Sequence, residues 1–415
     1  MSEDALAPHR RTLLVGASSA FTAFLTGAML PSPAWAAAPA WMRGASGTAV
    51  RKAFDFLAAR FDEYGSGAAL RVPRSYTGGF FGTTFVSSFV YDDALVILAW
   101  LARATAEDVE RATVLGDTLL YAQRHDPIGD GRTRASYQPD SFTTLDGTLD
   151  IGSPAAYTGN QAWAGIALAH LYARTGQPRF LTGALREATW IQEHTWDGAR
   201  APYGYTGGRG ATGQPLTFKA TEHNIDVGAF FTMLARLTGD HGWRARAGAA
   251  FAFVAAMRDR ADGHLWTGTD PDGVTTNRAP IPEDVQTWAY LATLDDRYRR
   301  SVTWVLDRLA ARDAGVAGVS FSDADVSKVW LEGTAHTALA LRARAAKGDT
   351  LLARRLLWNI QQAQATTPAG DGRGIPAASS DGLDTGFGDL YYASPHTGTT
   401  AWFLLAALDS NPFRI

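Results

Sequence analysis

Residues 221–239 read TEHNIDVGAFFTMLARLTG, and this stretch joins a polar opening to a long apolar stripe. The polar residues come first, at Glu222, His223, Asn224 and Asp226. Apolar residues follow at every third or fourth position, at Val227, Phe230, Phe231, Leu234 and Leu237. This spacing predicts an α-helix, and Gly239 is a typical residue for its C-terminal end. The sequence therefore predicts a helix that carries polar side chains at its N-terminus.

The same order of polar residues followed by an apolar helix recurs five more times. The further copies are YDDALVILAWLARA from Tyr91, YTGNQAWAGIALAHLYARTG from Tyr157, PEDVQTWAYLATLD from Pro282, LEGTAHTALALRARAAKGD from Leu331 and SPHTGTTAWFLLAAL from Ser394. The intervals between copies are too loose for a solenoid of near-identical repeats. They are regular enough to indicate one supersecondary unit that is used repeatedly.

Amphipathic helices, each with a single apolar stripe, are predicted between these segments. They span residues 48–64, 106–124, 179–194, 242–258, 297–312 and 350–364. A helix with one apolar stripe belongs on the outside of a bundle, and a helix that is apolar around most of its circumference belongs inside. We therefore expect an outer helix followed by an inner helix, six times, in one domain without an internal linker.

Several outer helices are followed by an Asp-Gly turn signal and an aromatic-rich loop that leads to the next inner helix. The turn signals are Asp130-Gly131, Asp197-Gly198, Asp262-Gly263 and Asp371-Gly372. If the helix pairs close into a ring, these loops and the polar starts of the inner helices meet at one end. We expect a concave polar mouth there, with aromatic side chains around it.

This alternation of helices, with acidic and aromatic residues at the start of each inner helix, resembles the six-hairpin glycosidase superfamily. The segment YDDALVILAWLAR at residues 91–103 is similar to the inner-helix start common in that superfamily. The resemblance covers residues 48–409. It implies an all-α fold, the (α/α)6 barrel, which we expect at 48–415 after a short linker at 37–47. It also implies a carbohydrate-active enzyme, and the superfamily includes hydrolases, lyases, epimerases and isomerases.

The first 36 residues have the order of an export signal. Arg10 and Arg11 precede an apolar run over residues 13–30, and Ala34-Trp35-Ala36 supplies a small-residue cleavage site. This resembles a twin-arginine signal peptide, so we expect the twin-arginine export machinery as a partner and a periplasmic or extracellular location. The alternative is a short membrane anchor, because the apolar run approaches spanning length. Membrane contact is expected only through an uncleaved leader.

The composition indicates a sugar as partner and argues against nucleic acid. The formal net charge is -3, and the chain has no basic run. It has 13 Trp, 13 Tyr and 20 Phe, many of them in the loops, where Trp and Tyr faces can stack on sugar rings. Most aromatic side chains pack in cores. Trp266 stands out because no helical stripe accounts for it. We expect an oligo- or polysaccharide substrate.

The acidic residues at the starts of the inner helices are candidates for catalysis. Glycoside hydrolysis requires two carboxyl groups, one on each side of the scissile bond. We predict that Glu222 is one of them, because three consecutive polar residues exceed what helix capping requires. The predicted partner is Asp93, Asp284 or Glu332. The competing interpretation is structural, since acidic residues in a first helical turn stabilise the helix dipole.

The other residues at the expected mouth are candidates for substrate binding. They are Asp92, Tyr157, Asn160, Trp163, His223, Asn224, Trp266, Glu283, Trp288, Trp330, His336, Asp384 and His396. The histidines lack a metal-binding spacing such as HExxH, and the chain contains 0 Cys, so no metal site is predicted. No glycine-rich phosphate loop is found, so no cofactor is expected.

Two further functions stay open at this point. A lyase or an epimerase would use a His or Tyr to remove a proton from a sugar ring. A uronic acid substrate would favour arginine in the mouth, and Arg209 and Arg278 are the loop candidates. A glycan-binding protein without catalytic activity would need the aromatic loops but no essential carboxylate.

Overall fold

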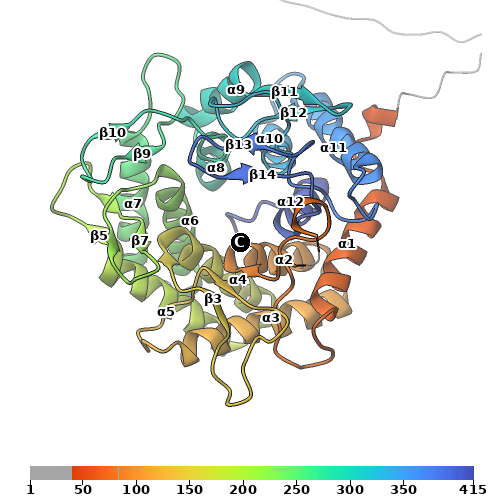
Figure 1. Ribbon diagram of the computed structural model, residues 1–415. Helices are drawn as coiled ribbons and strands as arrows, with labels where there is room; N and C mark the ends of the chain where they lie inside the picture. The colour runs from red at the N-terminus through yellow and green to blue at the C-terminus, as the bar shows by residue number, and fades with distance from the viewer. Residues whose placement is uncertain (1–39, 83) are drawn as a thin grey trace, which may run out of the picture. The chain divides into compact units, whose positions relative to one another are not determined.

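Two concentric rings of α-helices make up the barrel in the computed structural model, which describes residues 40–82 and 84–415 (Figure 1). The inner helices are α2 (Val90–Arg103), α4 (Thr158–Thr175), α6 (Thr221–Thr238), α8 (Asp284–Thr293), α10 (Leu331–Arg344) and α12 (Thr397–Ala407). The outer helices are α1 (Gly47–Asp62), α3 (Ala106–His125), α5 (Pro178–Thr195), α7 (His241–Ala256), α9 (Arg299–Arg308) and α11 (Asp349–Thr366).

Each inner helix contacts the next one along the chain, and α12 returns to contact α2. The ring is therefore closed, and the predicted (α/α)6 barrel is confirmed. The inner helices are buried around most of their circumference, as their composition predicts. In α12 every residue from Thr397 to Ala406 is buried, whereas the outer helix α9 buries only Ser301, Val302, Trp304 and Val305.

Helix α6 shows how local sequence sets these boundaries. Its C-terminal residue is followed by Gly239, which adopts the left-handed conformation with φ 73° and donates its N–H to the Ala235 carbonyl. Glycine takes this conformation without a steric penalty, so the helix ends where the sequence predicts. Helix α4 can approach α6 closely because residue 165 is glycine. A Cβ at Gly165 would clash with the Phe230 ring of α6.

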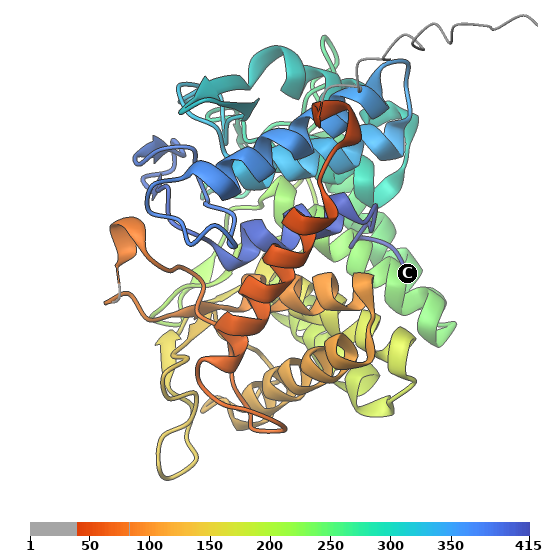
Figure 2. The same cartoon turned by 90° about the vertical axis from the view of Figure 1, so that its right-hand side faces the viewer.

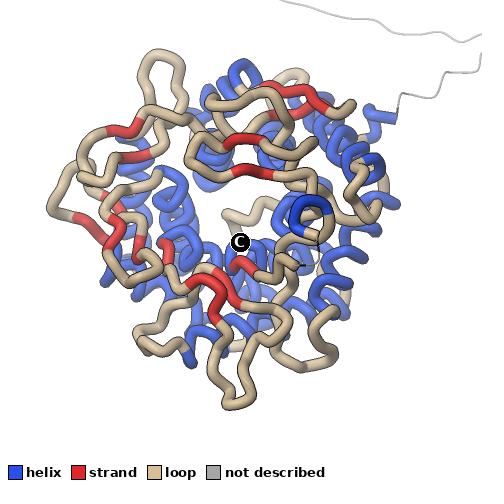
Figure 3. The backbone as a smooth tube through the Cα atoms, in the orientation of Figure 1, coloured by secondary structure: helices blue, strands red, loops and turns tan. Residues whose placement is uncertain are grey.

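Short antiparallel strands form in the loops at the N-terminal ends of the inner helices (red in Figure 3). Two three-stranded sheets are β1 (Ser88–Phe89), β2 (Ser136–Tyr137) and β3 (Ile151–Ser153), and β4 (Ala156–Tyr157), β7 (Gly208–Arg209) and β8 (Pro215–Leu216). The two-stranded pairs are β5 (Trp196–Asp197) with β6 (Gly204–Tyr205), β9 (Gly268–Thr269) with β10 (Thr276–Asn277), β11 (Ala310–Asp313) with β12 (Val316–Val319), and β13 (Leu383–Asp384) with β14 (Leu390–Tyr391).

The C-terminus lies at the opposite end of the barrel from these hairpins (Figure 2). Phe413 is buried, and its ring centroid lies 5.2 Å from that of Trp163 and 5.5 Å from that of Trp288. Trp402 joins this cluster from α12, with its ring 5.9 Å from Trp163. This aromatic cluster fills the interior of the barrel. The opening at the hairpin end therefore extends inward only as far as these side chains.

Three features refine the expected boundaries. The outer helix expected at 297–312 ends at Arg308, because residues 310–313 pair with 316–319 as a hairpin. Two short 3-10 helices, η2 (Gly79–Phe81) and η3 (Asp296–Tyr298), lie outside the α-helices. A third, η1 (Ala40–Arg43), occupies part of the expected linker and contacts α11.

The expected leader, residues 1–36, lies outside the described residues and stays a prediction. Among the helices of the described part, none combines the length and the apolar character needed to cross a membrane.

The contact between α4 and α6 provides a test of the closed ring. We expect Gly165→Val to lower the free energy of unfolding by about 1–3 kcal/mol, because valine overpacks against Phe230. Urea denaturation followed by circular dichroism should show a single transition at a lower midpoint. The control is Gly248→Ala on the exposed side of α7, where a Cβ meets nothing within 4 Å. Alanine there should stabilise the helix by about 0.5–1 kcal/mol. Two separate transitions in the parent protein would contradict the closed ring.

Candidate active site

A cavity of about 540 Å³ opens at the N-terminal ends of the inner helices. Every inner helix, or the residue just before it, contributes to its wall. The lining residues are Tyr76, Phe89, Tyr91, Asp92, Ala135, Ser153, Tyr157, Gly159, Asn160, Trp163, Glu222, Asp284, Trp288, Phe321, Trp330, Glu332, Asp389, Tyr391 and His396. Five of these carry carboxyl groups. No Lys or Arg lines the cavity within the described part of the chain, so the cavity is strongly acidic.

Glu222 and Asp284 lie in the first turns of α6 and α8. Burial raises the pKa of Glu222 to about 8, and the negative charges of Asp284 and Glu332 add to this effect. Burial also raises the pKa of Asp284 to about 7, with Glu283 adding to it, while the Val285 N–H donates to Asp284 Oδ1 at 2.6 Å and opposes the shift. The negative charge of one carboxylate opposes ionisation of the other, so the pair holds one proton more readily than it loses both.

Asp226 follows Glu222 one turn later on α6 and is fully buried. Burial raises its pKa well above the usual range, and the charges of Glu222 and Asp284 add to the shift. Burial therefore favours the uncharged form of Asp226, which does not line the cavity.

His396 precedes α12 and is held by the opposite wall of the cavity. Its Nε2 lies 3.0 Å from Asp92 Oδ2, its Nδ1 accepts from the Thr399 N–H at 3.2 Å, and its ring stacks on Tyr76 at 4.1 Å. Burial by itself would lower the pKa of His396, but the Asp92 carboxylate outweighs it and the pKa is raised. Gly398 permits this approach, because a Cβ there would clash with Asp92.

Glu332 is fixed from two sides on α10. The Tyr91 hydroxyl donates to Glu332 Oε1 at 2.8 Å and accepts from the Trp402 indole N–H at 2.8 Å. The Thr399 hydroxyl donates to Glu332 Oε2 at 3.2 Å. Burial raises the pKa of Glu332, and the histidines at 396 and 336 partly oppose the shift. The carboxyl therefore has a fixed orientation in the cavity wall.

Glu283 and His336 were predicted to bind substrate, but they lie behind the cavity wall. His336 Nδ1 is 3.0 Å from Glu283 Oε2, and the Thr337 hydroxyl donates to Glu283 Oε1 at 2.8 Å. Both side chains are fully buried. Burial raises the pKa of Glu283 to about 8 and lowers the pKa of His336 to about 3. They join α8 to α10 and have no contact with the cavity.

Most of the residues predicted at the mouth do line the cavity. These are Asp92, Tyr157, Asn160, Trp163, Glu222, Asp284, Trp288, Trp330, Glu332 and His396. His223 lines an adjoining hollow of about 480 Å³. The sequence pattern therefore brings together residues from five of the inner helices and from the start of the sixth.

Asp93, Asn224, Trp266 and Asp384 lie elsewhere. Asp93 is buried and accepts from the Ser88 hydroxyl at 2.7 Å. The Asn224 amide bonds to both backbone groups of Tyr205, at 2.8 and 2.9 Å.

The other two side chains also have local partners. Trp266 contacts His264 edge-on and lies under the Arg278 guanidinium, 5.3 Å from the ring centre. Asp384 is exposed and accepts from the Gly386 N–H in the β13–β14 turn. Hydrogen bonding and packing thus explain these residues without a ligand.

Six lining residues with aromatic or acidic side chains were not among the predicted site residues. They are Tyr76, Phe89, Tyr91, Phe321, Asp389 and Tyr391. Tyr91 was within the quoted inner-helix motif, and its position beside Asp92 was an available signal. The others come from the loops, where no periodic pattern indicates which side chains turn inward.

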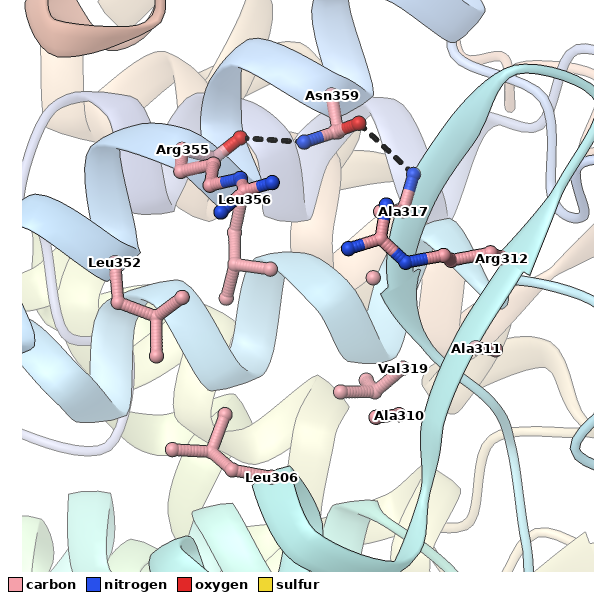
Figure 4. Close-up of a pocket in the computed structure, with 11 residues that line it drawn as sticks. Leu306, Ala310, Ala311, Arg312, Ala317, Val319, Leu352, Arg355, Leu356 and Asn359 are labelled. Carbon is pink, nitrogen blue, oxygen red and sulfur yellow. Dashed lines mark hydrogen bonds between the residues drawn. The ribbon is translucent and has the colours of Figure 1, made fainter.

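Two features outside the mouth do not belong to this site. A groove of about 450 Å³ lies between α9, the β11–β12 hairpin and α11 (Figure 4). Asn359 spans it, accepting from the Ala317 N–H and donating to the Arg355 carbonyl. Asp259, Asp262 and His264 also lie close enough to hold a metal ion, but Asp259 and Asp262 cap the backbone of their own turn. Neither feature provides a carboxyl group to the cavity.

No protein-family model matches this chain, and no curated protein matches it. Several solved structures do match. A D-mannose isomerase has 14% identity and a TM-score of 0.63, over 88% of this chain and 97% of that chain. The cellobiose 2-epimerase of Bacillus thermoamylovorans has 11% identity and a TM-score of 0.64, over 88% and 99%. A family 76 glycoside hydrolase (mannosidase) from Bacteroides thetaiotaomicron has 11% identity and a TM-score of 0.59, over 87% and 97%. The chain shares their (α/α)6 fold.

The raised pKa of Glu222 leads to a stability test. A carboxyl group whose pKa is higher in the folded state than in the unfolded chain destabilises the fold as pH rises from the usual glutamate value of 4.5 through about 8. Glutamine cannot ionise. We therefore expect Glu222→Gln to raise the melting temperature within and above this pH range and to have little effect below it.

Glu107→Gln is the matched control, because Glu107 is also the second residue of a helix but is exposed on α3. A capping role for Glu222 predicts the opposite sign, a loss of up to about 1 kcal/mol at neutral pH. Such a loss would show that Glu222 serves the helix and not the cavity.

Proposed function

We propose that the protein is a carbohydrate-active enzyme, and specifically a glycoside hydrolase in which Glu222 is the general acid and Asp284 the base or nucleophile. The observation that carries this proposal is the placement of the pair: both carboxyl side chains line one cavity, and the charge of Asp284 raises the pKa of Glu222, which favours a pair that holds one proton. Hydrolysis of a glycosidic bond requires one carboxyl group in each state. The names of the structural neighbours, which include a mannosidase, support the same class.

In the proposed reaction, Glu222 donates its proton to the glycosidic oxygen as the bond from that oxygen to the anomeric carbon breaks. The Asp284 carboxylate attacks the anomeric carbon itself or takes a proton from the attacking water. Positive charge develops on the sugar ring in the transition state. The carboxyl groups of Asp92 and Glu332 line the same cavity. In the proposed reaction they stabilise that positive charge.

The proposed substrate is a neutral sugar. A uronic acid would bring a further negative charge into a cavity that has five carboxyl groups and no Lys or Arg among its described lining residues. The loop arginines that a uronate would require are elsewhere: Arg278 lies over the Trp266 ring, and Arg209 is in strand β7. This arrangement disfavours a lyase that acts on uronides. Tyr91, Phe321 and Tyr391 line the cavity and are partly exposed, so they add aromatic surface suited to the faces of a hexose.

An aldose epimerase or isomerase is the second candidate, because His396 lines the cavity and two structural neighbours carry those names. Such an enzyme needs a base that removes a proton from carbon. Both ring nitrogens of His396 already have partners: Nδ1 accepts from the Thr399 N–H, and Nε2 lies 3.0 Å from Asp92 Oδ2. Neither nitrogen is therefore free to take a proton from a sugar carbon, and this favours hydrolysis. Export of the protein through its leader stays a proposal, since those residues are not described.

The first functional experiment is a screen of neutral glycans. The panel consists of maltose, cellobiose, α-mannobiose, starch and mannan, with release of reducing ends as the readout. On the active substrate, Glu222→Gln and Asp284→Asn should each lower turnover by several orders of magnitude while substrate binding is retained. Glu107→Gln should be unaffected. Normal turnover by Glu222→Gln would remove this residue from the mechanism.

The pH dependence of kcat/KM should be bell-shaped. Activity should fall on the alkaline side as Glu222, with a pKa of about 8, loses its proton. It should fall on the acid side as Asp284, with a pKa of about 7, gains one. An alkaline limb that persists unchanged in Glu222→Gln would contradict the assignment.

Proton exchange separates the two candidate functions. Glucose, mannose and cellobiose are incubated with the protein in deuterated water and followed by NMR. A hydrolase leaves the hydrogen at C2 in place, and an epimerase or isomerase replaces it with deuterium. We expect no exchange at C2. Exchange that disappears in His396→Asn would establish the second candidate in place of the first.

A further inference from the structure

The acidic cavity does not end at the proposed catalytic pair. Tyr157, Glu222, Asp284 and Phe321 line this cavity and also line the adjoining hollow of about 480 Å³. Glu222 and Asp284 therefore lie at the partition between two compartments. Each compartment is within the size range of small-ligand sites.

The second compartment differs in chemistry from the first. Its wall is largely apolar, with Phe218, Ala220, Pro271, Pro282, Val285 and Phe387. Thr267, Thr269, Asn277 and His223 supply its polar groups. Burial lowers the pKa of His223 to about 4, so its ring is neutral at pH 7.

Lys219 also lines the second compartment, but its ammonium group is turned to other partners. Its Nζ donates to the backbone carbonyls of Arg200, Pro202 and Gly273 and lies 3.0 Å from Asp197 Oδ2. The compartment therefore presents no free charge apart from the shared pair, among the residues that the structure describes. A neutral ligand with apolar faces fits this surface.

We propose that the second compartment binds the leaving sugar unit of the substrate. The substrate is then an oligosaccharide of at least two neutral units, and the bond that breaks crosses the partition. This inference rests on the proposed function, because a glycosidic bond held between the Glu222 and Asp284 side chains must have one sugar ring on each side. The ring that reacts occupies the acidic cavity, where Asp92, Glu332 and His396 provide polar contacts. The leaving ring occupies the apolar compartment.

Two exposed aromatic residues support this placement. Phe387 is 47% exposed and Tyr157 is 37% exposed, although each lines the second compartment. The Phe387 ring contacts Phe321 edge-on with centroids 6.2 Å apart, so one face is free to stack on a sugar. Phe387 lies in the same β13–β14 loop as Asp389, which lines the acidic cavity. One loop thus contributes to both compartments.

The test compares two substrates with the same reacting sugar. One is the active disaccharide from the panel, which fills both compartments. The other is the glycosyl fluoride of that sugar, which has a single-atom leaving group and fills only the first. Phe387→Ala should lower kcat/KM for the disaccharide about tenfold through loss of ring contact, and leave the fluoride unchanged. The matched control is Phe80→Ala, since Phe80 is exposed but lines neither compartment. Equal losses on both substrates, or no loss on the disaccharide, would overturn the proposal.

A binding experiment keeps this test independent of turnover. Calorimetry on Glu222→Gln compares maltose, cellobiose and α-mannobiose with glucose and mannose. At least one disaccharide should bind more tightly than its monosaccharide. Adding Phe387→Ala should weaken only the disaccharide, about tenfold. If this difference appears without any hydrolysis by the parent protein, the second compartment stands and the hydrolase assignment falls. If no disaccharide binds better than its monosaccharide, the second compartment is overturned whatever the catalytic result.

Discussion

The carboxyl groups at the barrel mouth are the constraint around which the structure is built. Asp92, Glu222, Asp284 and Glu332 each lie in the first turn of an inner helix. Charged groups lose hydration when they are gathered into a closed-in space, and like charges repel one another. Two features offset this cost. The positive ends of the inner-helix dipoles face the mouth and favour anions by about 0.3–1 kcal/mol each. The remaining repulsion is relieved by protonation, which keeps Glu222 neutral at pH 7.

The closed ring is what makes this concentration of charge possible. An inner helix such as α6 buries its apolar body against α4, α7 and α8, and only its N-terminal turn reaches the cavity. The aromatic cluster of Trp163, Trp288, Trp402 and Phe413 fills the space below. The carboxyl groups therefore lie on a rigid, apolar base that limits hydration from behind. Burial on this base raises the pKa values of Glu222, Asp284 and Glu332, so packing in the core and protonation at the mouth have a common cause.

The sequence predicts the helices better than it predicts the orientation of single side chains. The inner helices are long, apolar stretches, so their place inside the barrel follows from composition, and a local signal, Gly239, ends α6 as expected. Neighbouring acids are harder to separate. Asp92 lines the cavity while Asp93 bonds to Ser88, and Asp284 lines it while Glu283 bonds to Thr337. Consecutive helical residues point in directions about 100° apart, so the rotation of the helix decides which one faces inward. Loop residues such as Tyr391 depend on hairpin geometry that has no periodic signal.

Burial and charged neighbours raise the pKa of Glu222 and favour its protonated form at neutral pH. The most direct measurement is a carbon-13 NMR titration of side-chain carboxyl groups in protein labelled at glutamate, with Glu222 identified by its absence in Glu222→Gln. We predict a pKa of about 8 for this signal, and a lower pKa in Asp284→Asn, where the neighbouring charge is removed. A pKa near the usual glutamate value of 4.5, unchanged in Asp284→Asn, would contradict this prediction.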